Sequence, residues 1–571
     1  MRIRFVFSRC CAALIASVVL TVLGKMDAAV ITAKSVSLTD VTTAITLAAD
    51  GDTVVVPAGT ATWTSGLNIT KGITLQGATT TNTGAYSLAS GTNTSAAYND
   101  QTIIIDDVPS TDPLVVATLS PTESFRLTGF TFRYGSVTSH PSGRVVLKGT
   151  CPSVRVDHCH FDQLYGQHLC PGGWLYGVID HCIFDARAGS SEILIVWHTA
   201  WGGGTNGFGD GSWADPSYFG SEKFIFIEDC IFNNDGGTET TNGCLDSWFG
   251  GRYVCRYNKF NNTRPANHGT ETGGRGRSCR AMEIYNNQIK YTINGNLGEI
   301  RGGTAVVHDN TYTGLMTAHP LAVFRRAYAS ANFGGATGGV PPGVSGSWDS
   351  NDTRTGPYTL GGFNYNPTNG LYASGQHTGA NSSTTLVVAI GAAGNPSPGW
   401  ATNQWAGFEV TNLDEACNSS VTYYNSRIIS NTNNTITYDH SGKTFAPNSK
   451  DLVWNTGNRF AIRLPLNVLD QPGSGQGQLL ADNPPVNTQQ GNTIAWPQDA
   501  LEPIYAWNNT LNSTPNFVTI ANVDPILQAN RDFFTNTPKP GYTPYVYPHP
   551  LVSGSVPSST PSPPTNLRIV P

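Results

Sequence analysis

The stretch Val154-Arg-Val-Asp-His-Cys-His-Phe161 decides the fold, because shortened versions of it recur along the chain. Val178-Ile-Asp-His-Cys-Ile-Phe184 and Phe226-Ile-Glu-Asp-Cys-Ile-Phe232 end in the same way, with Cys two residues before Phe. In later copies Asn takes the place of Cys, at Asn258, Asn287, Asn310 and Asn509. The chain is therefore built on an internal repeat.

The spacing of these copies indicates a solenoid. From Cys159 to Asn310 the steps are 23, 48, 28, 29 and 23 residues. A step of 23 to 29 residues fits one circuit of about three short strands, and we interpret the step of 48 as two circuits. Each circuit can bury its apolar side only against its neighbours. We predict an all-β parallel β-helix in which the Cys and Asn side chains form one buried row, with amides hydrogen-bonded along it.

The composition of the 571 residues agrees with a turn-rich β protein. Only 13% of the residues are charged, against ~25% on average, and there are 62 Gly and 35 Pro. Only 4 Met, with abundant Thr, Asn and aromatic residues, disfavour a helical bundle. The formal net charge of −6 is not basic enough for a nucleic-acid partner.

Residues 1–29 are expected to be a secretory signal peptide. Arginines precede the apolar run Cys10–Leu23, and small residues follow it up to Ala29. This run is too short to span a bilayer, and no later segment is expected to be transmembrane. We expect a secreted protein, extracellular or periplasmic, whose mature part carries 29 basic and 38 acidic residues.

The rest of the chain divides by composition. Residues 30–335 are expected to form the β-helix, with a short amphipathic helix opened by Thr39-Asp40 as its N-terminal cap. Residues 336–465 combine a Gly- and Pro-rich segment with a small inserted β unit. Residues 466–552 return to the β-helix, and the Ser- and Pro-rich residues 553–571 form a tail.

Nine cysteines remain in the mature chain, an odd number that leaves at least one without an intramolecular partner in an oxidising compartment. The cysteines of the row lack CxxC spacing, so we interpret them as structural and not as metal ligands. The better disulfide candidates lie off the row: Cys151, Cys170, Cys244, Cys255, Cys279 and Cys417.

Two neighbouring segments carry opposite charge. Residues 192–246 hold nine acids and one base, and residues 252–301 hold nine bases and three acids. Neighbouring circuits of a solenoid lie about 5 Å apart, so a cation-attracting and an anion-attracting patch would share one face. Such a face suits an acidic polysaccharide as the partner.

An acidic polysaccharide can be cleaved by elimination from its uronate units. This reaction requires a base for a weakly acidic proton and positive charge to neutralise the adjacent carboxylate. His268 can serve as a base near neutral pH, whereas arginine has a pKa above ~12. Trp201 lies in a Gly-rich loop and offers a flat face to a sugar ring. Basic residues of the second segment are expected to bind substrate: Arg256, Lys259, Arg277 and Arg301.

Residues Val36–Tyr312 resemble the right-handed parallel β-helix proteins of the pectate-lyase type, which include secreted bacterial proteins. The stretch Asn242-Gly-Cys-Leu-Asp246 is similar to the calcium-site rung of that family, which implies Ca²⁺ held by Asn242 and Asp246. Arg275-Gly-Arg-Ser-Cys-Arg280 resembles the arginine cluster that supplies the proton-abstracting residue there. The resemblance implies Arg275 as the base and Arg280 as a substrate clamp.

The leading prediction is therefore a secreted lyase that cleaves an acidic, uronate-containing polysaccharide by β-elimination, with His268, Arg275 and Arg280 as catalytic residues. Two alternatives stay open. One is a noncatalytic carbohydrate-binding or cell-surface structural solenoid, and the other is a glycoside hydrolase with paired carboxylates. The fold alone does not choose among the three.

Overall fold

The computed structural model describes residues 28–89, 93–136, 144–187, 192–198, 216–234, 244–267, 278–293, 299–315, 321–323, 359–360, 363–364, 371–406, 408–415, 424–438, 440, 452–463, 472–475, 500–515, 520–522, 529–530 and 532–553. Nearly all of the predicted signal peptide lies outside these ranges. In the described part of the chain, no helix is long and apolar enough to cross a bilayer.

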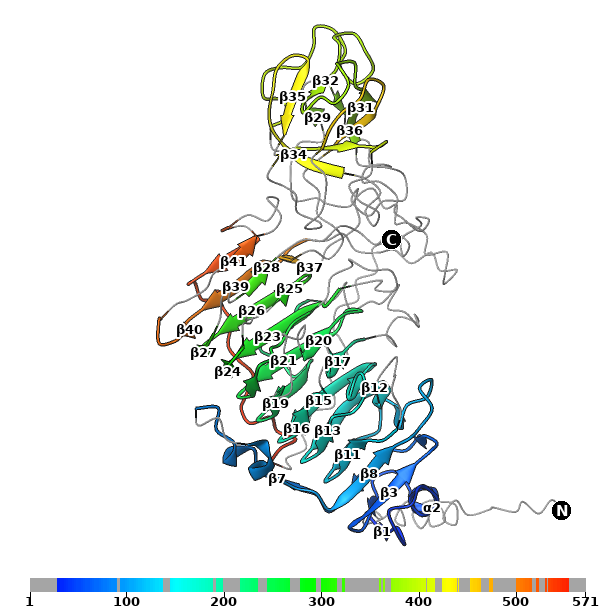
Figure 1. Cartoon of the computed structure of the whole chain (residues 1–571). Coiled ribbons are helices and arrows are strands. Elements are labelled where there is room, and N and C mark those ends of the chain that lie inside the picture. The colour runs from blue at the N-terminus through cyan, green and yellow to red at the C-terminus, as the bar shows by residue number, and fades with distance from the viewer. Residues whose placement is uncertain are drawn as a thin grey trace, which may run out of the picture.

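The main body is a right-handed parallel β-helix, as the repeat and the family resemblance predict, and its strands form long parallel sheets (Figure 1). Sheet A contains β1 (Val30–Thr32), β2 (Thr53–Val55), β5 (Thr74–Gln76), β10 (Phe125–Thr128), β12 (Val145–Asp157), β15 (Trp174–Asp180), β18 (Ile225–Glu228), β21 (Arg252–Arg256), β23 (Ala281–Tyr285), β26 (Thr304–His308), β39 (Ile504–Trp507) and β42 (Phe533–Thr535).

Two further parallel sheets contribute strands to the circuits. Sheet B contains β3 (Gly59–Trp63), β8 (Thr102–Asp106), β11 (Thr131–Tyr134), β13 (His160–Asp162), β16 (Ile183–Asp185), β19 (Ile231–Asn233), β22 (Lys259–Asn261), β24 (Gln288–Tyr291), β27 (Thr311–Gly314) and β40 (Thr510–Leu511). Sheet C contains the first part of β12 with β4 (Leu67–Ile69), β9 (Val115–Leu119), β14 (Leu169–Pro171), β17 (Leu194–Val196) and β20 (Leu245–Ser247).

The predicted buried row lies where sheet A turns toward sheet B, and it runs through Cys159, Cys182, Cys230, Asn258, Asn287, Asn310 and Asn509. The backbone N of Cys230 donates to Asn258 Oδ1 at 2.9 Å, which joins the Cys part to the Asn part. Each Asn Nδ2 then donates to the next Oδ1: Asn258 to Asn287 at 3.1 Å, Asn287 to Asn310 at 2.9 Å, and Asn310 to Asn509 at 2.9 Å. The row is confirmed as a structural element of the core.

The step of 48 residues between Cys182 and Cys230 is one circuit, not the two that spacing alone predicts. Val178 of β15 pairs directly with Phe226 of β18, and β16 pairs directly with β19. The additional length lies between β17 and β18. Packing of neighbouring strands sets the register of a circuit but places no limit on the length of a connection that leaves the sheet.

α2 (Leu38–Leu47) covers the first end of the β-helix and buries Val41, Ala44 and Ile45. Ser37 caps it, because its hydroxyl accepts from the backbone N of Asp40 at 3.3 Å. The helix therefore begins one residue before the predicted Thr39-Asp40 start.

A separate β unit is inserted between β26 and β39, which pair directly through Val306 and Tyr505. The unit is an antiparallel sheet in the order β31 (Leu371–Gln376), β36 (Arg459–Arg463), β33 (Glu409–Asn412), β34 (Tyr424–Asn431), β35 (Thr435–Tyr438) and β32 (Leu386–Val387). It has its own core, which includes the fully buried Trp405 and Trp454. The predicted inserted β unit is thus confirmed as an element of the fold.

The eight described cysteines are buried and free, so none of the off-row candidates among them forms a disulfide. Their thiols bond to the chain around them: Cys151 Sγ donates to the Glu123 carbonyl at 3.0 Å, and Cys279 Sγ donates to the Gly251 carbonyl at 3.3 Å. They behave as small core residues. Cys417 lies outside the described residues.

Candidate functional site

The outward face of sheet A carries several paired charges in the described part of the chain. Alternate residues of a strand face the same side, so Val154 and Val156 point into the core while Arg155 and Asp157 point outward. Strand pairing then places one acid per circuit in the outward row that contains Asp157, Asp180 and Glu228. We call these three residues the acid row.

The first acid of the row belongs to a unit of Arg, Asp and His. Arg126 of β10 donates from Nε and Nη2 to the two carboxylate oxygens of Asp157, at 2.7 and 3.0 Å. Asp157 Oδ1 lies 3.3 Å from Nδ1 of His158, which begins the turn after sheet A. The carboxylate thus fixes both the guanidinium and the imidazole.

The next circuit repeats the same unit. Arg155 donates to both oxygens of Asp180 at 2.8 Å, and Asp180 Oδ2 lies 2.9 Å from Nδ1 of His181. The rings of His158 and His181 are stacked, with centroids 5.1 Å apart and planes within 3° of parallel. Each imidazole keeps about a third of its side chain exposed, 37% for His158 and 33% for His181.

The surroundings set the charge of these groups. Burial opposes ionisation of Asp157, but hydrogen bonds from His158 and Arg126 and the charge of Arg155 outweigh it and lower its pKa to about 2. Its hydrogen bond with Asp180 raises the pKa of His181, against the opposing effect of burial. Because a carboxylate accepts at each Nδ1, that nitrogen carries the proton and Nε2 is left to exchange one with a ligand.

A pocket of about 490 Å³ opens beside Arg126 and Arg155, among the first strands of sheet A. Most of its walls come from β5, β10, β12 and the turns before β5 and β10, and Gly51 and Leu551 complete them: Gly51, Gly72, Ile73, Thr74, Thr122, Glu123, Ser124, Phe125, Arg126, Ser153, Arg155 and Leu551. The Arg126 side chain is 40% exposed. Arg126, among hydroxyl side chains, is suited to bind a carboxylate, whereas Arg155 is 11% exposed and already donates to Asp180 and to the Leu551 carbonyl.

On β15, β18, β21 and β23 the outward face packs against residues Gly541–Ser553, which we call the C-terminal strap (red in Figure 1), and against Tyr218 and Phe219. Near its start, Tyr542 Oη donates to Glu283 Oε2 at 2.5 Å. Near its end, the Leu551 carbonyl accepts from Arg155 at 2.9 Å. Burial raises the pKa of Glu283 to about 7, although Tyr542 and the backbone N of Gly220 both donate to it.

Five of the site residues predicted from the sequence lie outside the described residues, and their roles stay predictions: Trp201, Asn242, His268, Arg275 and Arg277.

Two other predicted residues form ion pairs within the fold. Arg256, predicted to bind substrate, is fully buried and donates to Glu228 at 2.7 Å. Arg280, predicted to be a catalytic clamp, donates to both oxygens of Glu502 at 2.6 and 2.9 Å. Neither side chain lines the pocket.

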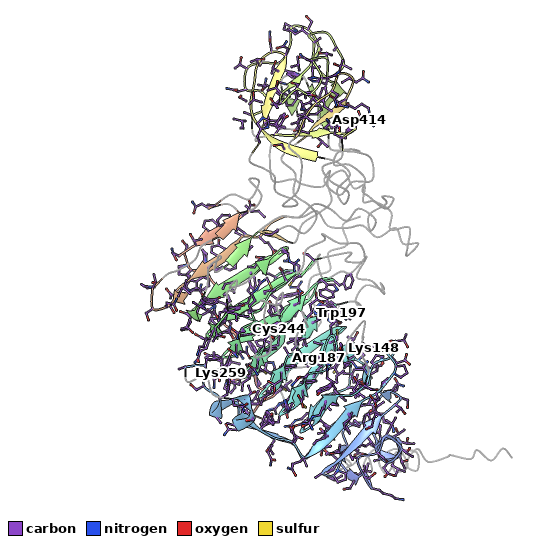
Figure 2. All side chains as sticks on the ribbon, in the orientation of Figure 1. Lys148, Arg187, Trp197, Cys244, Lys259 and Asp414 are labelled. Atoms are coloured by element: carbon purple, nitrogen blue, oxygen red, sulfur yellow. The ribbon has the colours of Figure 1, made fainter. Side chains whose placement is uncertain are left out.

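Two more of the basic residues are held by backbone carbonyls. Lys259 Nζ donates to the carbonyls of Thr83 at 2.8 Å and Tyr86 at 2.6 Å (Figure 2). These bonds hold the segment of Thr83 and Tyr86 against sheet B. Arg301 Nε donates to the Asn267 carbonyl at 3.0 Å, and Arg301 is 8% exposed. The described geometry gives both residues a structural role and does not bring them together.

Asp246, the predicted cation ligand, is buried on sheet C and accepts from the backbone N of Ser247 at 2.7 Å. Two groups of three His or acidic ligands lie close together in the described part of the chain, and neither includes Asp246. In the group of Asp157, His158 and Asp180, arginines already bind both carboxylates. Asn242 lies outside the described residues, so calcium at Asn242 and Asp246 stays a prediction.

The second group surrounds His160 on the outward face of sheet B. Its Nδ1 lies 2.9 Å from Asp100 and its Nε2 lies 3.1 Å from Asp185, while Tyr98 stacks on the ring at 4.0 Å. Burial lowers the pKa of His160, but the two carboxylates outweigh it and raise the value to about 9. Both nitrogens of the resulting imidazolium are bound, so we interpret His160 as a structural residue that holds Tyr98 and its neighbours against sheet B.

No role was predicted from the sequence for Arg126, Asp157, His158 or Arg155. One signal for them was present, because Asp-His occurs at the same place in two successive repeats, at 157–158 and 180–181. The pairing with Arg126 has no such signal, since that arginine comes from a circuit without the Asp-His pair.

Comparison with known proteins adds little to this geometry. No family model and no curated protein matches the sequence. Among solved structures, a mutant of the PL6 family alginate lyase AlyGC is similar over 52% of this chain and 40% of that chain, with 12% identity and a TM-score of 0.22. The function is therefore argued from the residues of this chain.

Proposed function

We propose that this chain is a secreted lyase that cleaves an acidic, uronate-containing polysaccharide by β-elimination. The observation that carries the proposal is the pair of Arg–Asp–His units on sheet A, whose arginines Arg126 and Arg155 line the pocket. They combine guanidinium groups held in place by carboxylates with partly exposed imidazoles, and elimination requires a group that binds the uronate carboxylate and a base. Secretion is proposed from the composition of residues 1–29.

Arg126 binds the substrate carboxylate in this proposal. Asp157 holds its guanidinium group in place and its side chain is 40% exposed, so little ordering is needed when a uronate carboxylate arrives. Charge that develops on this carboxylate as the neighbouring proton leaves is stabilised by the same group.

His158 is the base. Asp157 keeps its Nδ1 protonated, and Nε2 takes the proton from C5 of the uronate. The electron pair of that C–H bond forms the C4–C5 double bond, and the bond from C4 to the leaving oxygen breaks. The negative charge moves to this oxygen.

His181 is the acid and gives a proton from Nε2 to the leaving oxygen. Its raised pKa favours the protonated form, and its ring lies 5.1 Å from that of His158, a spacing that suits groups acting on adjacent carbons. Transfer of the proton from His158 to solvent and uptake of one by His181 restore the starting state.

The hydrolase alternative fits the same residues less well. A glycoside hydrolase needs one carboxyl group that is protonated and can act as an acid. The pKa of Asp157 is lowered to about 2, Arg126 donates to Asp157, and Arg155 donates to Asp180. These paired carboxylates are therefore ionised acceptors of the arginines and not proton donors.

The test is ultraviolet absorbance during incubation with pectate, alginate and glycosaminoglycan panels, with a parallel assay for new reducing ends. Elimination creates an absorbing unsaturated uronate together with each new end, and hydrolysis creates only the end. Absorbance with at least one substrate supports the proposal. Binding without either signal would favour the noncatalytic solenoid, and reducing ends without absorbance would favour the hydrolase.

The same assay separates the two candidate sites. The pair Asp157→Asn and Asp180→Asn removes the carboxylates of the described units, while His268→Ala and Arg275→Ala remove the residues predicted from the sequence. We expect the first pair to abolish the absorbance signal and the second pair to leave most of it. The opposite pattern would keep the reaction class and move the site to His268 and Arg275.

A further inference from the structure

The C-terminal strap crosses the strands of sheet A before it turns at residues 550–553, and arginines of the sheet bind its carbonyl groups. Arg256 donates to the carbonyls of Tyr545 and Val546 at 2.7 and 2.8 Å. Arg155 donates to those of Leu551 and Val552 at 2.9 and 3.4 Å. The outward face of sheet A thus already holds one stretch of polypeptide across several of its strands.

Acidic groups of the same face bind the donors of the strap. Glu228 of the acid row accepts from the backbone N of His549 at 2.8 Å, and Asp229 accepts from Tyr547 Oη at 3.0 Å. The His549 side chain is buried, so the strap is seated firmly at this circuit. A chain of sugars could not occupy these circuits at the same time.

The strap ends at the pocket. Leu551 forms part of the pocket wall, and Arg155 belongs both to that wall and to the last contacts of the strap. Arg126 lies one strand further toward the N-terminal end, and its guanidinium binds Asp157. From β5 to β12 the pocket crosses two strand spacings, about 10 Å, which is room for only a few sugar rings.

We infer that the C-terminal strap is the end stop of the substrate groove, so that the protein engages one end of the polysaccharide and releases short products of uniform size. This inference rests on the proposed function and adds a mode of attack to it. A substrate that enters over Thr74 and Arg126 meets Leu551 after a few sugars and cannot extend further. Leu551 is therefore a specificity-determining residue, and Arg155 positions it.

The experiment changes only the end of the strap. A stop after Pro550 removes Leu551 and everything beyond it, while the contacts of Glu283, Arg256 and Glu228 with the strap remain. A stop after Ser553 is the matched control, because it removes only residues 554–571. Leu551→Gly is a second test that keeps the chain length and removes only the side chain at the wall.

Product size and solution viscosity are measured against absorbance on a long substrate. We expect the wild type and the control to release short products from the start while viscosity falls slowly. The stop after Pro550 and Leu551→Gly should release longer products, with a several-fold greater loss of viscosity for the same absorbance.

Two results would overturn the inference, and they are distinct. A wild type that gives absorbance with long, mixed products and rapid loss of viscosity contradicts the end stop and leaves the lyase proposal intact. Absence of absorbance from every variant contradicts the lyase proposal itself, and the end stop falls with it. If the stop after Pro550 does not fold, as judged by circular dichroism, Leu551→Gly decides alone.

Discussion

Asn287→Ala tests the buried Asn row, on which the register of the solenoid depends. The Asn287 amide donates to the carbonyls of Cys255 and Tyr285 at 2.9 and 3.1 Å and to Asn310 Oδ1 at 2.9 Å. Its oxygen accepts from the backbone N of Asn258 at 3.0 Å. Alanine removes all of these bonds and leaves the buried N–H of Asn258 without this acceptor.

The expected loss of stability follows from these hydrogen bonds. A buried donor left unpaired costs ~1–3 kcal/mol, and each lost hydrogen bond adds ~0.5–1.5 kcal/mol. We expect the free energy of unfolding of the β-helix to fall by about 3–5 kcal/mol. Gln288→Ala is the matched control, because the neighbouring side chain is exposed and its removal should cost less than about 0.5 kcal/mol.

Urea denaturation followed by circular dichroism measures both variants. The β-helix transition of Asn287→Ala should move to lower urea, and that of Gln288→Ala should stay with the wild type. If Asn287→Ala unfolds within about 0.5 kcal/mol of the wild type, a change usual for neutral surface substitutions, the row does not stabilise the fold as argued.

Three further predictions concern pH and thiol chemistry. If His181 is the acid, kcat/KM should fall as pH rises through its pKa, which lies above the ordinary 6.5, and an alkaline limb below pH 6.5 would refute that role. Burial raises the pKa of Glu283 from 4.5 to about 7, so the folded state binds the proton more tightly and stability should decline by on the order of 3 kcal/mol as pH rises from about 4.5 through 7. Glu283→Gln should flatten this decline in urea titrations at several pH values, and an unchanged slope would show that Glu283 does not cause it. Burial raises the pKa of the Cys151 thiol to about 11 and that of Cys244 to about 12, so a thiolate-directed reagent should label neither until the chain is unfolded, and prompt labelling seen by peptide mass spectrometry would contradict their burial.

The repeat was the part of the structure that the sequence could predict. Each circuit places a Cys or an Asn at the same position of the row, because that side chain must fit against those of the neighbouring circuits. This constraint is visible in the sequence as a repeat. The connection between β17 and β18 obeys no such constraint, so its length misled the circuit count at the step of 48 residues. Strand pairing determines the register, whereas the loops between strands vary freely.

The charged residues were harder to place, because a count of charges does not say which are paired. Arg256 and Arg280 belong to the basic segment, yet their carboxylate partners are 28 and 222 residues away in the chain. The contact of the strap with sheet A could not be predicted from the sequence either, since Leu551 and Arg155 are 396 residues apart in the chain. Burial by a distant segment converts a predicted binding surface into a structural contact.

The most direct test of the central claim is the initial rate of β-elimination by His158→Ala and His181→Ala on the preferred substrate. General acid and base groups contribute ~10²–10⁴-fold, so each variant should lose about that factor while its affinity for the polysaccharide stays close to that of the wild type. Lys148→Ala, an exposed change on the same strand as Arg155, should keep the full rate. Wild-type rates in both histidine variants would contradict the assignment of the reaction to the Arg–Asp–His units.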